Sequence, residues 1–184
     1  MQNKNTILKK EADQLLHKYS LGSLLQEFSS EQNIYVSGSY MLDLMVWRDL
    51  DIYIDLKGIT QDEVYALITK VMEIYRPVWL ETKDSFNEET GCPKGYFLGF
   101  ETKIINDELW NVDIWITNKD YIVDHLKYMK GIVDKLDLES RNIIMKLKEE
   151  LIKVGVYGNE VFSVDIYDAV LFKGLKTVEE ILKK

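Results

Sequence analysis

The sequence predicts an α+β fold, with a mixed, mainly antiparallel sheet of about five strands flanked by helices and a helical C-terminal part. Alternating or short apolar runs bounded by turn residues, typical of strands, fall between residues 34 and 116. Helical periodicity precedes the first of these runs and interrupts them once. From residue 118 onward the pattern is helical only. We therefore expect a core at residues 1–117 and a helical part at residues 118–184 that packs on it.

The composition describes an ordinary globular protein and limits its partners. The 184 residues suffice for one domain with a sizeable core, and 46% of them are hydrophobic. The net charge of −8 argues against nucleic acid as a partner, because nucleic-acid binders usually present a basic face. Cys92 is a single cysteine, and His17 and His125 are too few for a histidine-based metal centre. No signal peptide or membrane-spanning run is present, so we expect a cytoplasmic protein that does not bind membranes.

Two helices are predicted before the first strand. Residues 6–20 carry an apolar stripe at helical spacing, formed by Ile7, Leu8, Ala12, Leu15, Leu16 and Tyr19. Gly22 is expected to break this helix and Ser23 to cap a second, shorter one. Residues 34–56 then read as a short strand, a turn at Gly38 and Ser39, a short helical piece, and a second strand that opens at Asp49.

The clearest helix prediction lies at residues 60–75. Thr60 and Glu63 have the spacing of a capping box. The residues expected to face inward are Val64, Leu67, Ile68, Val71, Met72 and Tyr75. Pro77 is expected to stop the helix and to hold Arg76 in an extended conformation.

The remaining elements follow in order. Residues 78–82 predict a third strand, residues 83–95 a mobile loop, and residues 96–105 and 110–116 a strand pair across a turn at 106–108. In the last strand Trp110, Val112, Ile114 and Ile116 share one face and Asn111, Asp113 and Trp115 the other. The expected helices are one capped by Asn118 and ended by Gly131, one at 138–154 stopped by Gly155, one capped by Ser163 and ended by Gly174, and one opened by a Thr177–Glu180 capping box.

The second strand carries the candidate chemistry. Because side chains alternate along a strand, Asp49 and Asp51 share a face with Tyr53 and Asp55, while the apolar residues between them point to the core. Two carboxylates held on a strand form a hard-oxygen site suited to Mg²⁺. The turn at residues 38 and 39 can direct backbone N–H groups at a phosphate.

Gly38-Ser39, followed after nine residues by Asp49-Leu50-Asp51-Ile52, resembles the signature of the DNA polymerase β nucleotidyltransferase superfamily. The resemblance spans residues 34–116 and is strongest to small, minimal or antibiotic-modifying members. It implies that residues 1–117 form a catalytic core in which Asp49, Asp51 and a third carboxylate hold two Mg²⁺ ions. One departure is Ser37, where the family usually has an apolar residue. We expect that serine to loosen the packing behind the turn.

Several assignments stay open at this level. Asp113 is the expected third carboxylate, and Glu101 on the neighbouring strand competes with it. Ser39 is expected both to cap the following helix and to contact phosphate. No cation can be assigned to the triphosphate; the candidates are Lys94, Lys127, Arg141, Lys146 and Lys173, each also compatible with a solvated surface charge. His125 adjoins Asp124 but points about 100° away from it on a helix, so we interpret it as a surface residue.

The expected function is Mg²⁺-dependent transfer of a nucleoside monophosphate from a nucleoside triphosphate, with ATP as the expected donor. The acceptor would be a hydroxyl of a small molecule, such as an antibiotic, in a pocket walled by Asp55, Glu101 and Trp115. Two alternatives remain: a protein-modifying, AMP-transferring toxin–antitoxin component, and a non-catalytic nucleotide-binding module of the same fold. The sequence leaves the oligomeric state undetermined.

Overall fold

The computed structural model describes residues 2–29, 33–86 and 92–183. The helices are α1 (Gln2–Asp13), the π-helix η1 (Gln14–Lys18), α2 (Leu21–Gln26), α3 (Gly38–Leu42), α4 (Gln61–Tyr75), α5 (Lys119–Val133), α6 (Leu138–Lys153), α7 (Ser163–Leu171) and α8 (Val178–Leu182). The strands are β1 (Ile34–Val36), β2 (Asp49–Asp55), β3 (Trp79–Asp84), β4 (Gly95–Ile105) and β5 (Glu108–Thr117).

The five strands form one mixed sheet in the order β1-β2-β5-β4-β3, which confirms the predicted fold class. Within this sheet, as far as the structure describes it, β2 and β5 run parallel and the other three neighbouring pairs are antiparallel. The parallel pair needs a long connection, and α4, β3 and β4 provide it. Residues far apart in the sequence therefore lie side by side at the centre of the sheet.

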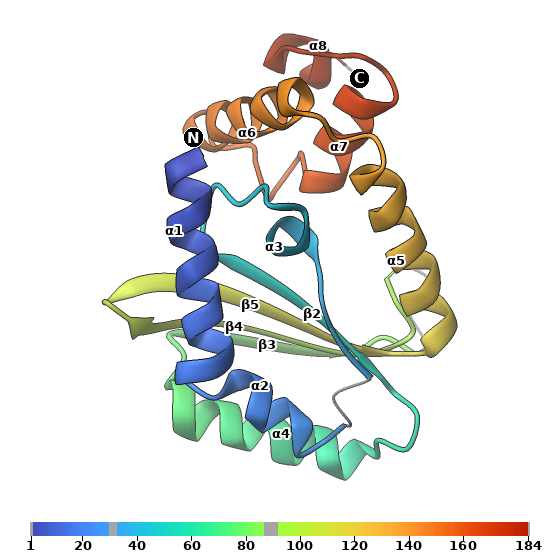
Figure 1. Cartoon of the computed structure of the whole chain (residues 1–184). Coiled ribbons are helices and arrows are strands. Elements are labelled where there is room, and N and C mark those ends of the chain that lie inside the picture. Colours follow the sequence, from blue (N-terminus) through green and yellow to red (C-terminus); the bar gives the residue numbers. More distant parts are fainter. Residues whose placement is uncertain (1, 30–32, 87–91, 184) are drawn as a thin grey trace.

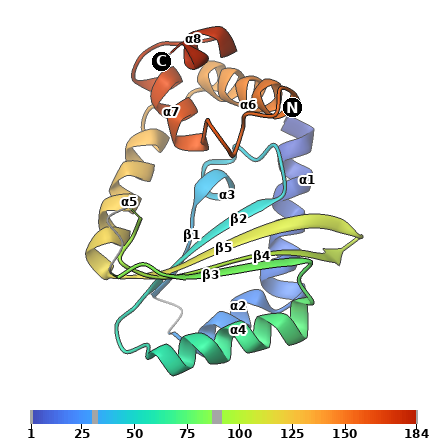
Figure 2. The same ribbon diagram turned by 180° about the vertical axis from the view of Figure 1, so that it is seen from behind.

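The two faces of the sheet pack against different helices (Figure 1). One face, with Leu50, Ile52 and Ile54 fully buried, packs on α1, α2 and α4 in the larger hydrophobic core. The other face looks toward α3, α5, α6 and α7, which share a second hydrophobic core with α8. Figure 2 shows the same layers from behind, with α8 farthest from the sheet. The face that carries the acidic residues thus lies between the sheet and the helical C-terminal part.

Several predicted boundaries are wrong near the helix ends. Helix α2 begins at Leu21, with Gly22 and Ser23 inside it. A Cβ atom at position 22 would lie 3.1 Å from the Leu16 carbonyl oxygen, so the glycine permits a close approach to η1. Helix α5 runs past Gly131 to Val133 because Ile132, fully buried, anchors the last turn. Ser163 is the first residue of α7, and Asp165 accepts the N–H of Phe162 there.

Helix α4 confirms the Thr60–Glu63 capping box, with both reciprocal hydrogen bonds present. Val64, Leu67, Val71 and Tyr75 are buried as predicted, whereas Met72 is 56% exposed because it lies about 100° around the helix from Val71. Arg76 was expected to be extended, and this is wrong. It adopts a left-handed conformation (φ 44°, ψ 58°), which ends the helix as a C-cap and redirects the chain toward β3.

The predicted hairpin of β4 and β5 is confirmed, with Trp110, Val112, Ile114 and Ile116 buried on one face. The loop expected at residues 83–95 is shorter, since Lys83 and Asp84 continue β3 and β4 begins at Gly95. Residues 87–91 of that loop lie outside the described residues. Helix α6 and the Thr177–Glu180 capping box of α8 agree with prediction. In the described ranges, no helix combines the length and apolar character needed to cross a membrane.

Candidate active site

A row of carboxylates lies at the centre of the sheet. Asp49 and Asp51 point to the same face of β2, and the parallel register pairs Asp51 with Asp113 and Asp49 with Asn111 of β5. The Asn111 side-chain amide donates to Asp49 Oδ1 at 2.7 Å. The parallel register therefore brings all three predicted carboxylates together, while Glu101 lies beyond Asn111 on β4.

Burial is the first cause of a raised pKa in all three carboxyl groups. Burial, followed by the negative charges of Asp49 and Asp113, raises the pKa of Asp51 well above its ordinary value. Burial and the charge of Asp49 raise the pKa of Asp113 to about 7. For Asp49, burial raises the pKa, and the hydrogen bond from Asn111 and the positive charge of Lys148 only partly offset it. Clustered acids in a partly dehydrated position favour a bound cation, which would stabilise their ionised forms.

The first residues of α3, Gly38 and Ser39, here called the Gly38–Ser39 turn, pack against this row. Gly38 has φ +61°, a conformation that favours glycine. A Cβ atom there would lie 1.8 Å from Asp51 Oδ2, so any side chain at position 38 would collide with the carboxylate. The backbone N–H of Ser37 donates to the backbone oxygen of Asp51 at 2.9 Å, which fixes the turn to β2. Gly38 and Ser39 thus lie directly beside the candidate metal ligands.

Ser39 does not cap α3, contrary to expectation; the N-cap residue is Ser37, whose side chain makes no capping bond. The Ser39 hydroxyl is instead part of a buried network with Lys148 and Tyr167. Lys148 Nζ donates to Ser39 Oγ at 2.7 Å, to the Leu44 carbonyl oxygen at 3.0 Å and to the Tyr167 hydroxyl at 3.3 Å. Ser39 Oγ and the Tyr167 hydroxyl are 3.1 Å apart. A lysine of the C-terminal part therefore reaches the Gly38–Ser39 turn.

Lys148 is completely buried, and sequence reasoning missed it. Burial alone would lower its pKa, but the phenolic groups of Tyr167 and Tyr157 more than offset this and the pKa lies above the ordinary value. Its signal was present in the sequence. Lys148 follows Ile144 by four residues and precedes Leu151 by three, so it lies on the apolar stripe of α6.

The five cations considered from the sequence lie outside the lining of the main pocket, as far as the structure describes it. Lys127 pairs with Asp124, Lys146 pairs with Glu150, and Arg141 donates to the Leu42 carbonyl oxygen. Lys94 and Lys173 are exposed elsewhere on the surface.

The carboxylates open into a pocket of about 830 Å³. Its floor is the acidic face of the sheet, and the strand register arranges the floor in three rows across β2, β5, β4 and β3. The rows are Asp49-Asn111-Glu101-Trp79, Asp51-Asp113-Gly99-Glu81 and Tyr53-Trp115-Phe97-Lys83. The opposite wall comes from Trp47 and from the C-terminal part, including Tyr157, Phe162 and Tyr167. Glu101 and Trp115 line the pocket as expected.

Asp55 was expected to be a solvated or acceptor-holding residue, and this is wrong. It is 6% exposed and does not line the pocket. Its carboxylate accepts the backbone N–H of Lys57 at 3.1 Å and lies 4.0 Å from Lys119 Nζ. Asp55 therefore belongs to the far end of β2, where the chain leaves the sheet.

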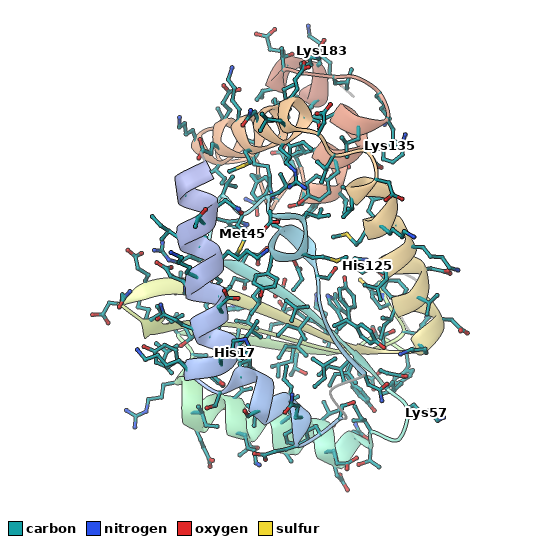
Figure 3. All side chains as sticks on the ribbon, in the orientation of Figure 1. His17, Met45, Lys57, His125, Lys135 and Lys183 are labelled. Carbon is teal, nitrogen blue, oxygen red and sulfur yellow. The ribbon has the colours of Figure 1, made fainter. Side chains whose placement is uncertain are left out.

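His125 was interpreted as a surface residue, and this is also wrong. It is half-buried, lines the pocket, and lies on the side of α5 that faces the sheet (Figure 3). Its Nε2 is 2.8 Å from Ser37 Oγ, and its ring centroid is 4.4 Å from that of Tyr53. Asp124 is exposed and points elsewhere, as the helical geometry predicted. The missing information was the position of α5 against β2, which the sequence does not encode locally.

The three aspartates fit a Mg²⁺ ion that is shared with the phosphates of a substrate. Within the described residues, no three His, Cys, Asp or Glu side chains converge closely enough to hold a metal ion by themselves. Mg²⁺ is commonly held by one or two carboxylates together with substrate phosphates and water, rather than by an all-protein cage. Asp49, Asp51 and Asp113, with the Gly38–Ser39 turn beside them, match that mode of binding.

No protein-family model matches the chain, and no match was found among curated proteins. Among solved structures, a crystal structure of a Cid1 poly(U) polymerase variant bound to MgATP has a similar fold, with a TM-score of 0.60 and 13% sequence identity. The similarity covers 94% of this chain and 52% of that chain, so this chain spans about half the length of the polymerase. At this identity the likeness is one of fold.

Proposed function

We propose that this protein is a Mg²⁺-dependent nucleotidyltransferase that moves a nucleoside monophosphate from a nucleoside triphosphate to a hydroxyl group of a small molecule. One observation carries the proposal: the Gly38–Ser39 turn touches Asp51, which is paired in register with Asp113. Nucleotidyl transfer requires a phosphate-binding group next to carboxylates that can hold metal ions, and this contact would supply both.

The donor nucleotide would bind on the side of the turn and the C-terminal helices. Ser39 Oγ lines the pocket and offers a hydroxyl to the outgoing phosphates, while Lys148 Nζ, buried 2.7 Å behind it and outside the pocket lining, adds a positive charge. Burial makes this charge strong, because little water screens it. The aromatic side chains of Trp47, Tyr157 and Phe162 line the same part of the pocket and can stack on the base.

Asp49, Asp51 and Asp113 would hold two Mg²⁺ ions, which when bound stabilise the charge on the attacking and leaving oxygens. In the reaction the acceptor hydroxyl oxygen forms a bond to the α-phosphorus, and the bond from that phosphorus to the bridging oxygen of pyrophosphate breaks. Asp113, on the acceptor side of the row, takes the hydroxyl proton. The products are a nucleoside monophosphate ester and pyrophosphate.

A small acceptor agrees with the charge of the chain and of the pocket. Beyond the carboxylate row the floor carries Glu81 and Glu101, with Trp79 and Phe97 beside them. Lys83, the cation nearest to this region, lies 3.0 Å from Glu81. A polynucleotide would bring further phosphates over this acidic surface on a protein of net charge −8. An uncharged or cationic hydroxyl compound meets no such repulsion.

The proposal is tested by pyrophosphate release. The protein is incubated with Mg²⁺ and each of ATP, GTP, CTP and UTP, with and without amino-sugar antibiotics, other polyols, protein substrates or oligo(U). We expect Mg²⁺-dependent release that one of the small hydroxyl compounds stimulates, with the nucleotide recovered on that compound. Stimulation by oligo(U) or by a protein instead would replace the small-molecule acceptor. Binding of nucleotide without any release would favour a non-catalytic module.

A further inference from the structure

We propose that His125 is a positioning residue for nucleotidyl transfer: through Ser37 it holds the Gly38–Ser39 turn in register with Asp51. The inference rests on the proposed function, since it concerns the same site. It assigns a role to a helix of the C-terminal part, α5, and to a serine that departs from the resemblance described above.

The contact between the two side chains is short and enclosed. His125 Nε2 lies 2.8 Å from Ser37 Oγ, and Ser37 is fully buried. A serine at a helix N-cap ordinarily turns its hydroxyl onto an N–H of the first helical turn. Ser37 is the N-cap of α3, yet its side chain makes no such bond. Its hydroxyl therefore bonds α5 instead of its own helix.

Ser37 is tied to the carboxylate strand on its other side. Its backbone N–H donates to the backbone carbonyl oxygen of Asp51 at 2.9 Å. The next residue, Gly38, has no room for a Cβ atom because Asp51 Oδ2 would be 1.8 Å from it. Ser37 thus stands between His125 and Asp51, and a shift of Ser37 moves the turn relative to the carboxylate.

The imidazole is itself held in place. Its ring packs against Tyr53 at 4.4 Å with an interplanar angle of 33°, and Tyr53 in turn lies 6.3 Å from Tyr121. Burial lowers the pKa of His125, so the ring is neutral at neutral pH. A neutral imidazole has one donor and one acceptor nitrogen, and either arrangement can bond a hydroxyl group. Tyr53 follows Asp51 on the same face of β2, so both contacts of the ring lead back to the carboxylate strand.

Catalysis depends on such positions because a small misplacement of reacting groups costs much of the rate. Residues that orient metal ligands from outside commonly change activity about 10–100-fold when replaced. Ser39 has a second anchor, because Lys148 Nζ donates to its Oγ at 2.7 Å, and this bond does not involve His125. Loss of the His125–Ser37 bond should therefore leave nucleotide binding largely intact and lower the rate of transfer.

The test compares Ser37→Ala, His125→Leu, the double variant and His125→Gln, with Asp124→Asn as the matched control. Asp124 adjoins His125 in sequence but is exposed and contacts only Lys127 in the described structure. For each protein, kcat for pyrophosphate release from MgATP is measured, together with the Kd of Mg²⁺ and α,β-methylene-ATP by calorimetry. Circular dichroism reports the fold, and Ser37→Ala, which removes one oxygen atom, keeps the test valid if the leucine variant unfolds.

We expect kcat to fall about tenfold or more in each single variant, while the Kd changes less than about threefold. The double variant should be no slower than the slower single one, because both remove the same bond. Glutamine, whose amide can reach the position of Nε2, should recover most of kcat, and Asp124→Asn should match the wild type. Three results would overturn the positioning role of His125 without affecting the proposed function. They are an unchanged kcat in Ser37→Ala and His125→Leu, additive losses of kcat in the double variant, or weaker nucleotide binding together with a lower melting temperature. A wild-type protein that releases pyrophosphate from none of ATP, GTP, CTP and UTP and binds none of them would overturn the proposed function, and this inference with it.

Discussion

Asp51 of β2 and Asp113 of β5 are direct partners across the parallel strand pair, although α4, β3 and β4 separate them in the sequence. Burial raises the pKa of both carboxyl groups, the charge of Asp49 raises both further, and Gly38 packs its backbone against Asp51 Oδ2. The fold therefore stabilises an arrangement of like charges that is unfavourable unless a cation is present. The predictions below follow from that arrangement.

Asp51→Asn keeps the shape of the side chain and removes its charge. We expect Mg²⁺ affinity and pyrophosphate release to fall at least tenfold. In metal-free buffer the free energy of unfolding should rise by roughly 1 kcal/mol, since a buried like charge is lost. Calorimetry with Mg²⁺ and thermal unfolding with EDTA measure the two effects. Normal turnover in this variant would remove Asp51 from the metal site.

Asp113→Asn should damage turnover far more than nucleotide binding, because Asp113 is proposed to act on the acceptor side. Glu101→Gln is the matched comparison, as Glu101 lies on the same floor but opposite Asn111. We expect kcat to fall about a hundredfold or more in the first variant and less than about threefold in the second. The reverse order would make Glu101 the third ligand.

The pH dependence of stability has a definite sign. The pKa of Asp113 rises from its ordinary value of 3.8 to about 7 in the folded protein, so the folded form binds more protons than the unfolded form between these values. Its contribution to stability therefore falls as the pH rises from about 4 to 7, by roughly 2–4 kcal/mol. Saturating Mg²⁺ should remove this loss, because a cation stabilises the ionised carboxyl group.

The control for this effect is Asp113→Asn. His125 affects the pH dependence of stability with the opposite sign. Burial lowers its pKa, so its contribution to the free energy of unfolding falls as the pH falls. The difference between wild type and Asp113→Asn isolates the carboxyl group from that background. The measurement is a set of melting curves at several pH values with EDTA. If the two proteins show the same pH dependence, the raised pKa of Asp113 is contradicted.

Lys148→Met preserves most of the volume of the side chain and removes its charge. We expect the Kd for Mg²⁺ and α,β-methylene-ATP to rise at least tenfold, because the buried cation nearest to Ser39 is lost. Stability should also fall by about 1–3 kcal/mol, since the Leu44 carbonyl oxygen loses its donor in the interior. Lys146→Met, an exposed position on the same helix, is the control. Equal affinity in both variants would exclude Lys148 from the nucleotide site.

Much of the fold could be predicted because its helices and strands have clear local hydrophobic periodicity. Alternation identified β2 and β5, and the Thr60 and Thr177 capping boxes placed two helix starts. Helix ends were less predictable, since Gly22 permits a close approach of α2 to η1 and Gly131 lies within α5 without ending it. The left-handed Arg76 likewise reflects the path to β3 more than the proline after it.

The candidate site divides in the same way. The sequence predicted Asp49 and Asp51 as a pair on one strand. It predicted Asp113 because a carboxylate is unexpected within an otherwise apolar strand. The parallel register that joins them is a tertiary property without a local signal. Lys148 carried a signal, a lysine on an apolar helix face, that was overlooked. His125 carried none, because its role depends on how α5 packs beside Ser37 and Tyr53.

The most direct test is an anomalous diffraction measurement on crystals grown with Mn²⁺ and α,β-methylene-ATP. The account predicts two Mn²⁺ peaks about 3.5–4 Å apart, bound by Asp49, Asp51 and Asp113, with the triphosphate beside Gly38, Ser39 and Lys148 Nζ. Fully occupied nucleotide elsewhere in the molecule, with no Mn²⁺ at these three carboxylates, would contradict it.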